Sequence, residues 1–383
     1  MSDYITDGKG RNTMDKKIQP KLRFRGFTDA WEQRKGAEVI CVRRDTIANP
    51  PKDIVDVELE NLIEGGGLQG DLSLRTASTS VFHEHDTLFG RLRPYLRKFW
   101  FANTSGVKSG EIWSLYSSTL KPEFLYALTQ SAQFLNQALQ TAGTKMPRAE
   151  WKTIVEAYFA VPQAEEQEKI GILFQKLEQL IDAEKRKLHL LQERKRSLLK
   201  GIFNRTIRFE GFTGVWKQQK LKDEAISISA GGDIDREKLL PSGRYPVIGN
   251  ALSNNGIIGY YANDYEVKGP AVTVTGRGEV GVAKAREMNF TPVVRLLAIK
   301  SLHDSHFLEC AINLHRAPLE STGVPQLTIP IISNYKLLFP PTLMEEMSIG
   351  LLFKHIDSLI AAVFLKIELL NLKKQSLLQQ MFV

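Results

Sequence analysis

The chain repeats its own sequence, and this repeat constrains the fold more than any other feature. Residues 22–35 read LRFRGFTDAWEQRK and residues 207–220 read IRFEGFTGVWKQQK, so the skeleton Arg-Phe-x-Gly-Phe-Thr-x-x-Trp-x-Gln-x-Lys occurs twice. A second pair of matching segments covers residues 170–203 and 349–382. Repeats at this scale indicate duplicated structural units. We therefore predict two copies of one plan: an entry motif, a globular stretch, a Pro-containing joint and a long helix.

The joints precede the two helices. Val161-Pro162 ahead of Glu165-Glu166 corresponds to Phe339-Pro340 ahead of Glu345-Glu346. Apolar residues then recur at spacings of three and four through both repeated tails, which predicts two long amphipathic helices. About 40 residues at 1.5 Å each give a rod of roughly 60 Å. An apolar stripe of that length must be covered, and we expect the two helices to cover each other as an antiparallel coiled coil.

The polar face of the first helix is densely basic between Lys185 and Lys200. Such a face is either simply solvated or turned toward phosphates or a partner, and the sequence does not distinguish the two.

The two globular stretches, about 36–160 and 221–338, show no obvious likeness to each other in sequence. Strand-like runs such as AVTVTG and VVRLLAI alternate with Gly- and Asn-rich turns and one helix-like stretch, LKPEFLYALTQSAQFLNQAL. This mixture predicts α+β domains. The predicted divisions are a disordered arm at 1–20, a first domain at 21–160, a first long helix at 161–205, a second domain at 206–340 and a second long helix at 341–383.

Lys and Arg number 51 against 43 Asp and Glu, which gives a net charge of +8 and favours a polyanionic partner. Cys41 and Cys310 are too few and too far apart for a zinc motif or a disulfide framework, so we expect reduced thiols in a cytoplasmic protein. No unbroken apolar run approaches the roughly 20 residues that span a bilayer. The polar N-terminus carries no signal-peptide core. We therefore expect no membrane association.

The order and duplication of these segments resemble the specificity subunit of type I restriction-modification systems. The resemblance rests on the RFxGFTxxW motif that occurs twice, on the Pro-then-Glu-Glu-Gln-x-x-Ile joint at Pro162–Ile170, and on the paired helices ending in KRSLLKGIF and KKQSLLQQMF. It extends from Lys21 to Val383. The second joint, FPPTLMEEMSIG, departs from the pattern because it keeps Glu345 and Glu346 but replaces the Gln.

This resemblance implies two target-recognition domains, each binding one half of a split DNA site. They would be separated by the antiparallel helix pair in an arrangement with an internal pseudo-twofold repeat. It also implies two methyltransferase subunits and motor-nuclease subunits as partners. S-adenosylmethionine, ATP and Mg²⁺ would belong to those partners, and this chain would bind no cofactor or metal and perform no catalysis.

The motifs of the chain itself favour binding over catalysis. An amino-methyltransferase needs an Asn/Asp-Pro-Pro-aromatic motif, and Asn49-Pro50-Pro51 is followed by Lys52. Gly276-Arg277-Gly278-Glu279-Val280-Gly281 has the spacing of a dinucleotide-binding loop, but no strand ending in an acidic residue follows, so we predict a tight turn between strands. Gly65-Gly66-Gly67 lacks the Lys-Ser/Thr of a phosphate loop.

Two histidines are the remaining candidates for a metal site. His83 and His85, with Asp86 adjacent, are expected on one face of a strand. Two imidazoles without further ligands are more often structural than metal-binding.

DNA contacts are expected where basic, amide and aromatic side chains gather, because Arg and Lys contact guanine and phosphate, and Asn and Gln contact adenine. In the first domain the basic and aromatic run after Gly90 is predicted as a strand with one buried and one exposed face, and a loop follows before Arg148. In the second domain we favour a polar Asn-rich turn and the Gly-rich turn. The candidate DNA-contacting residues are Arg91, Arg93, Tyr95, Arg97, Lys98, Thr144, Lys145, Arg148, Asn250, Ser253, Asn254, Asn255, Arg277, Lys284 and Arg286.

Unlike globular stretches imply an asymmetric bipartite DNA site with an unrecognised spacer. A competing class is a coiled-coil assembly scaffold whose basic charge is incidental, which salt-dependent, sequence-selective DNA binding by the methyltransferase-bound complex would exclude. A self-contained methyltransferase is disfavoured by the missing aromatic residue after Pro51.

Overall fold

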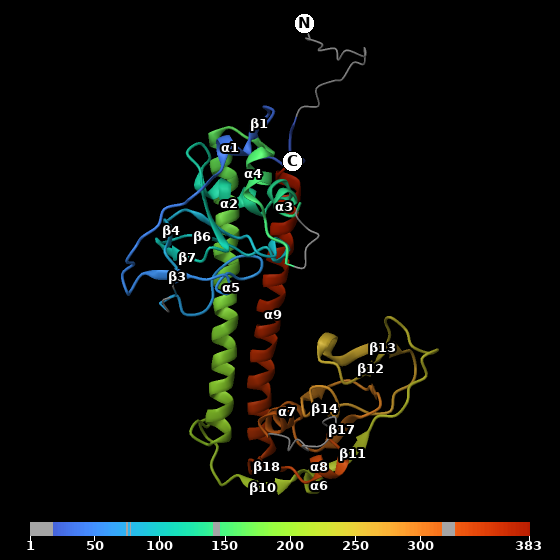
Figure 1. The fold of residues 1–383 in the computed structure, drawn as a ribbon. Coiled ribbons are helices and arrows are strands. Elements are labelled where there is room, and N and C mark those ends of the chain that lie inside the picture. The colour runs from blue at the N-terminus through green and yellow to red at the C-terminus, as the bar shows by residue number, and fades with distance from the viewer. Residues whose placement is uncertain (1–17, 74–75, 77, 141–145, 316–325) are drawn as a thin grey trace. The chain divides into compact units, whose positions relative to one another are not determined.

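The structure is a computed structural model of the chain, and it describes residues 18–73, 76, 78–140, 146–315 and 326–383. Most of the arm predicted at 1–20 therefore lies outside the described residues. The chain divides into two compact units, residues 1–185 with 366–383, and residues 186–365. We call these the first and second unit. Each contains a mixed α/β domain and parts of both long helices (Figure 1).

The first unit contains two small sheets and a helical layer. One sheet has the strand order β2-β8-β5-β6, the other β3-β7-β4, and β1 pairs separately with β9. The strands are β1 Glu32–Lys35, β2 Cys41–Val42, β3 Val55–Val57, β4 Ser80–Phe82, β5 Thr87–Gly90, β6 Phe99–Phe101, β7 Gly106–Lys108, β8 Ile112–Tyr116 and β9 Tyr158–Val161. The helices are α1 Gly36–Val39, α2 Pro122–Gln130, α3 Ala132–Ala138 and α4 Trp151–Glu156, with a 3₁₀ turn at Pro94–Leu96.

The main core of the first unit lies between the four-stranded sheet and the helices. Phe89 and Leu115 of the sheet belong to the same buried cluster as Phe124 of α2, Phe174 of the first long helix and Phe382 at the end of the second. These residues are each at most 5% exposed. The apolar stripe of each long helix is therefore partly covered by a domain.

The second unit repeats this plan with its own elements. Its sheets have the strand orders β11-β17-β14-β15 and β13-β12-β16, and β10 pairs with β18. The strands are β10 Lys217–Lys220, β11 Ala225–Ala230, β12 Tyr245–Ile248, β13 Ile257–Tyr261, β14 Ala271–Thr275, β15 Ala283–Arg286, β16 Thr291–Pro292, β17 Leu296–Ser301 and β18 Lys336–Phe339. The helices are α6 Leu221–Glu224, α7 Ser305–Leu314 and α8 Ile329–Ser333, with a 3₁₀ turn at Ser253–Gly256.

The two domains share a topology that the sequence did not reveal. When the four strands of each larger sheet are numbered along the chain, they lie side by side in the order 1-4-2-3. This order is β2-β8-β5-β6 in the first domain and β11-β17-β14-β15 in the second. Each three-stranded sheet has a central strand with one parallel and one antiparallel neighbour. A buried position can be filled by many apolar residues of suitable volume, so the sheet order persists where the sequences have no visible likeness.

The entry motifs serve the same structural role in both units. Arg23 Nε and Nη2 donate to the two carboxylate oxygens of Glu166 at 2.8 and 2.6 Å, and Trp31 Nε1 donates to the same carboxylate at 3.2 Å. In the second unit Arg208 and Trp216 bond Glu345 in the same way, at 2.8, 2.8 and 3.1 Å. The repeated Arg and Trp therefore fasten each entry motif to the start of a long helix.

These contacts correct the alignment of the two joints by one residue. Glu166 is equivalent to Glu345, because both accept the Arg and Trp bonds. Gln167 is then equivalent to Glu346: Gln167 Oε1 accepts from the backbone N–H of Lys121 at 3.0 Å, and Glu346 Oε2 accepts from that of Asp304 at 3.2 Å. Although the second joint has Glu346 where the first has Gln167, both side chains accept a hydrogen bond from the N-cap residue of a domain helix, α2 in the first unit and α7 in the second.

The long helices are α5 at Ala164–Phe203 and α9 at Leu343–Met381. Within the first unit Glu178 bonds Lys374 at 2.6 Å and Glu184 bonds Lys366, so the two segments run antiparallel. Within the second unit Lys195 pairs with Asp357. Gly171 and Gly350 each lie against the first turn of a domain helix, and a Cβ on Gly350 would lie 2.0 Å from Asp304 Oδ1. The repeated Ile-Gly pair therefore permits close helix packing.

Helix α9 departs from the expectation of no possible membrane span. Among the described helices, α9 is the one long and apolar enough to cross a membrane, judged by length and composition alone. Its most apolar window has a mean hydropathy of 1.6, and 28% of that window is buried. The sequence prediction was wrong on this criterion, because it counted unbroken apolar runs. Isolated charges such as Lys354 and Asp357 break the run without removing the apolar character.

His303 gives the second unit a predicted dependence on pH. Its ring bonds Glu346 of α9 and Glu224 of α6, each at 2.8 Å. Burial disfavours the charged ring, but the two carboxylates outweigh it and raise the pKa above the ordinary value of 6.5. Because the pKa of His303 is higher in the folded chain than in the unfolded chain, the protonated ring stabilises the fold. This contribution is fully present below about pH 6.5 and is lost as the pH rises through the folded-state pKa. We expect the unfolding free energy of the wild-type second unit to fall over that range.

His303→Leu should remove this dependence, because leucine has no ionisable group. Leucine is chosen because Leu120, before Lys121, occupies the equivalent position in the first unit. Thermal unfolding between about pH 6 and pH 8.5, followed by the fluorescence of Trp216, measures the effect. His189→Leu on the exposed face of α5 is the control. An equal pH dependence in H303L and H189L would contradict the prediction.

Candidate nucleic-acid interface

The basic run in the first domain is a loop, and the predicted strand is wrong. Strand β5 ends at Gly90 and β6 begins at Phe99. Between them Arg93 and Arg97 have left-handed backbone angles, φ 51° and 50°, on either side of a 3₁₀ turn that begins at Pro94. Pro cannot donate to a strand ladder, and left-handed residues interrupt pleating. The alternating pattern therefore reflects a turn that exposes several side chains.

The structure brings this loop together with the segment before the first joint. The N–H of Arg93 donates to the carbonyl of Pro147 at 2.8 Å, and that of Ala149 donates to Arg91 at 2.8 Å. Leu92 and Arg148 form a bridge. Two candidate clusters that lie about 50 residues apart in sequence thus form one surface. Thr144 and Lys145 lie outside the described residues.

Several candidates on this surface are already engaged. The Arg91 guanidinium lies 5.7 Å from the centre of the Trp113 ring, Lys98 Nζ donates to the Leu59 carbonyl at 3.0 Å, and Arg148 pairs with Glu111 at 2.9 Å. These contacts position the loop.

Arg93, Tyr95 and Arg97 are exposed, Tyr95 by 54%, and their side chains have no hydrogen-bonded partner in the described part of the chain. They are the members of the first cluster that remain free to contact a ligand.

The Gly-rich segment of the second domain is a turn between strands, as predicted. Residues 276–282 connect the antiparallel strands β14 and β15. Asn250 Oδ1 accepts from the N–H of Gly276 at 2.9 Å, and Asn250 Nδ2 donates to the Val294 carbonyl at 3.1 Å. Asn250 therefore holds the turn, and the exposed Arg277 projects from it without a side-chain hydrogen bond or ion pair to the described residues.

The polar turn after Asn250 is also exposed. Ser253, Asn254 and Asn255 lie in a 3₁₀ turn in which both asparagines have positive φ, 48° and 52°. Asn is among the residues that tolerate this conformation. The Asn254 amide donates to the Ile257 carbonyl at 3.0 Å, which leaves Ser253 and Asn255 as the exposed polar side chains there.

Lys284 and Arg286 lie on strand β15, after the Gly-rich turn. They line a cavity of about 430 Å³ that also contains Asn255 and residues of α9. Lys284 Nζ pairs with Glu309 at 3.3 Å, and Arg286 Nε donates to Thr273 Oγ1 at 3.0 Å. The structure therefore separates these two residues from the exposed group around Arg277.

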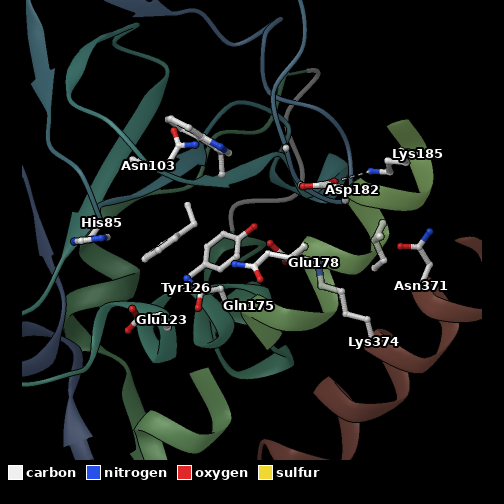
Figure 2. Close-up of a pocket in the computed structure, with 18 of the residues that line it drawn as sticks. His85, Asn103, Glu123, Tyr126, Gln175, Glu178, Asp182, Lys185, Asn371 and Lys374 are labelled. Atoms are coloured by element: carbon white, nitrogen blue, oxygen red, sulfur yellow. Dashed lines mark hydrogen bonds and ion pairs between the residues drawn. The ribbon is translucent and has the colours of Figure 1, made fainter. Parts of the chain in front are cut away.

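A second cavity, of about 270 Å³, lies in the first unit and was not predicted. In Figure 2, Tyr126 from α2, Glu178 from α5 and Lys374 from α9 converge on it. Burial raises the pKa of Tyr126 well above its usual value, and Glu178 adds to the shift. No local sequence motif marks this cavity, because its walls come from helix faces and strands far apart in the chain.

The two histidines lie in a turn, so the predicted strand face is wrong. Strand β4 ends at Phe82, and His85 has φ 70°. Asp86 is buried and accepts from Arg43, Ser114 and the N–H of His83. Burial opposes ionisation, but these bonds hold the pKa of Asp86 below its usual value. No group of three or more metal-ligating side chains lies within the described residues.

Comparison with known proteins finds a family match in the second half of the chain. Residues 214–376 match the family model described as the type I restriction modification DNA specificity domain. The matched residues include β11 to β18, both turns described above and most of α9.

Two Mycoplasma pneumoniae proteins named as type I specificity subunits are similar to this chain. One is 25% identical over 223 residues, which cover 55% of this chain and 60% of the relative. The other is 30% identical over 163 residues, which cover 40% of this chain and 50% of the relative. The chain thus spans 60% and 50% of the lengths of these two relatives.

The fold extends beyond the matched family segment. A crystal structure of a type I restriction-modification S subunit from M. genitalium superimposes with a TM-score of 0.73 at 14% identity. The match covers 96% of this chain and 99% of that one. At this level of identity the match shows a shared fold, which includes the first unit.

Proposed function

We propose that this chain is the non-catalytic subunit that selects the DNA sequence for a type I restriction-modification complex. In this proposal each unit binds one half of an asymmetric, split DNA site. The observation that carries the proposal is the family match of residues 214–376 to a DNA specificity domain, together with exposed and unengaged arginines at a turn of each domain.

The shared topology supports a pseudo-twofold repeat in which two target-recognition domains hold different loops. The exposed groups differ, with Arg93, Tyr95 and Arg97 in the first unit and Ser253, Asn255 and Arg277 in the second. Different loops on one framework favour recognition of different half-sites. Helices α5 and α9 would form an antiparallel coiled coil of about 60 Å that sets the spacer between them.

Partners complete the proposed complex. Two methyltransferase subunits and motor-nuclease subunits would supply catalysis and bind S-adenosylmethionine, ATP and Mg²⁺ in the cytoplasm. Helix α9 offers a surface for docking, because Leu351, Phe364 and Leu365 are 57–68% exposed in the second unit. Exposed apolar side chains in such number mark interaction sites on soluble proteins.

Genome-wide methylation mapping tests the proposed function. Cells that contain the methyltransferase partner would be compared with and without this chain. Loss of methylation at one split, asymmetric motif is the expected result. If the chain is an assembly scaffold with incidental charge, methylation would not depend on it at any motif while partner subunits would still be recovered with it.

The first-unit loop gives a residue-level prediction. Arg93→Gln combined with Arg97→Gln should weaken DNA binding by the methyltransferase-bound complex roughly tenfold or more near 0.15 M salt, because two cations are removed from the proposed interface. The slope of log affinity against log salt should fall by about one for each arginine that contacts a phosphate. Titration by fluorescence anisotropy at several salt concentrations measures both quantities.

The control for this variant is Arg34→Gln, which removes a partly exposed arginine of β1 that pairs with Glu32 and Glu38. It should leave affinity within about twofold. Equal effects of the loop and control variants would show that only overall charge matters.

A further inference from the structure

The cavity of the second unit has a wall that suits an apolar body. Its volume is about 430 Å³, and its apolar residues include Ile248, Ile257 and Phe290. Helix α9 contributes Asp357, which is engaged by Lys195. Ligand sites are typically concave and apolar, with a few convergent polar groups that orient the ligand.

Most charged groups around this cavity neutralise one another. Lys284 pairs with Glu309 at 3.3 Å. Glu287 accepts from His306 at 3.1 Å and also from Lys354. These cations and anions are therefore satisfied without a ligand.

Arg286 is the exception. Its Nε donates to Thr273 Oγ1, and its guanidinium makes no further hydrogen bond or ion pair to the described residues. Burial lowers the pKa of Arg286 to about 10, while Glu309 acts in the opposite direction. The group stays charged at neutral pH. A partly exposed cation therefore lines the cavity, with N–H donors that no described residue uses and that can bind an anionic group.

We propose that this cavity binds a small organic ligand through its carboxylate or phosphate group. The fork of Arg286 matches the two oxygens of such a group, as guanidinium does for carboxylates and phosphates elsewhere. Ile248, Ile257 and Phe290 cover the apolar body of the ligand. Arg286 is partly covered by the walls of the cavity, which favours a small ligand over the backbone of a DNA duplex. Asn255 lies at this cavity and also belongs to the group proposed to contact DNA, whereas Arg277 does not line it.

The first unit provides an internal comparison, because its cavity lies at the equivalent place. Glu178 and Asp357 each follow the anchoring Glu166 and Glu345 by twelve residues, and both line their cavities. The first cavity contains four carboxylates and no arginine among its lining residues. The place in the fold is thus duplicated, and the buried arginine is particular to the second unit.

Calorimetric titration of the full chain with phenyl phosphate tests the proposal. We expect wild type to bind phenyl phosphate more tightly than inorganic phosphate, because only the former has an apolar body. Arg286→Gln should weaken phenyl phosphate binding by roughly tenfold or more, as expected for loss of a charged hydrogen bond. Arg236→Gln, which removes an exposed arginine from the same unit, should change it less than about twofold. Absence of binding to wild type, or equal binding by wild type and R286Q, would overturn the proposal.

Two further measurements separate a binding role from other roles of Arg286. Without ligand, Arg286→Met should melt at the same temperature as wild type or higher, because a partly buried charge with no ion-pair partner in the described residues is removed. A lower melting temperature together with unchanged phenyl phosphate affinity in R286Q would make Arg286 structural and overturn the proposal.

DNA binding provides the remaining distinction. R286Q in the methyltransferase-bound complex should keep wild-type DNA affinity and salt dependence. A salt slope reduced by about one, with no phenyl phosphate binding to wild type, would assign Arg286 to a DNA phosphate and overturn the small-ligand proposal. The proposed function would stand in that case, because it depends on sequence-selective methylation.

Discussion

Glu166→Ala is expected to destabilise the first unit by about 3–5 kcal/mol, because it removes one partner from a buried ion pair. The Glu166 carboxylate is 2% exposed and accepts from both Arg23 and Trp31. Its loss would leave the indole N–H of Trp31 unpaired, and it would leave the largely buried Arg23 guanidinium without its counter-charge and with a bond to the Asp29 carbonyl alone among the described residues. The entry motif would also lose its attachment to the start of α5.

Urea denaturation followed by tryptophan fluorescence measures this loss, since four of the five tryptophans lie in the first unit. Glu165→Ala is the matched control, because Glu165 precedes Glu166 in the same helical turn and is exposed. It should shift the midpoint little. Equal midpoints for E166A and E165A would refute the role assigned to the Glu166 contacts.

The repeat made part of this triad accessible from the sequence. The repeated entry motif paired Arg23 with Arg208 and Trp31 with Trp216 in the sequence, whereas the counterpart of Glu166, Glu345, was identified only from the contacts. Their partnership was not predictable, because Arg23 and Glu166 are 143 positions apart. Pairing at that separation depends on the whole intervening domain. The periodic apolar residues, by contrast, report local geometry, and they correctly predicted the long helices α5 and α9.

The binding surfaces were predicted less well than the frame. The run from Arg91 to Lys98 was identified as basic and aromatic, but its alternation suggested a strand where Pro94 and two left-handed residues make a turn. Tertiary contacts, invisible in the sequence, then decided which arginines are engaged. Arg148 faces Glu111, whereas Arg93 has no such carboxylate.

The two cavities also could not be predicted from the sequence, but for a different reason. Each is walled by a domain helix and sheet residues, together with α5 and α9 in the first unit and with α9 in the second. In sequence, Glu178 or Asp357 is one polar position on an amphipathic helix, which ordinarily faces solvent. The positions became informative only when the anchors Glu166 and Glu345 aligned the two copies. Symmetry between the units, more than any motif, was the signal that related the cavities.

The apolar face of α9 leads to the second large prediction. Phe364→Glu combined with Leu365→Glu should weaken association with the methyltransferase partner by roughly a hundredfold or more, because two charges would be buried in an apolar interface. Both side chains are exposed, by 57% and 59%, so the chain itself should remain folded. Co-purification and analytical ultracentrifugation of the mixed subunits measure the association, and circular dichroism checks the fold.

Leu302→Glu is the control for this face, since Leu302 is 81% exposed on the loop after β17 and lies outside α9. It should leave assembly unchanged. The apolar helix has two other possible covers, a lipid bilayer and a second copy of the chain, and the same samples distinguish them. Partition of the wild-type chain into liposomes, or a concentration-dependent dimer that persists in excess methyltransferase, would contradict the assignment of this face to the methyltransferase. If assembly is lost in F364E/L365E and retained in L302E, the methyltransferase contact lies on α9. Other residues of this helix belong to the buried core of each domain.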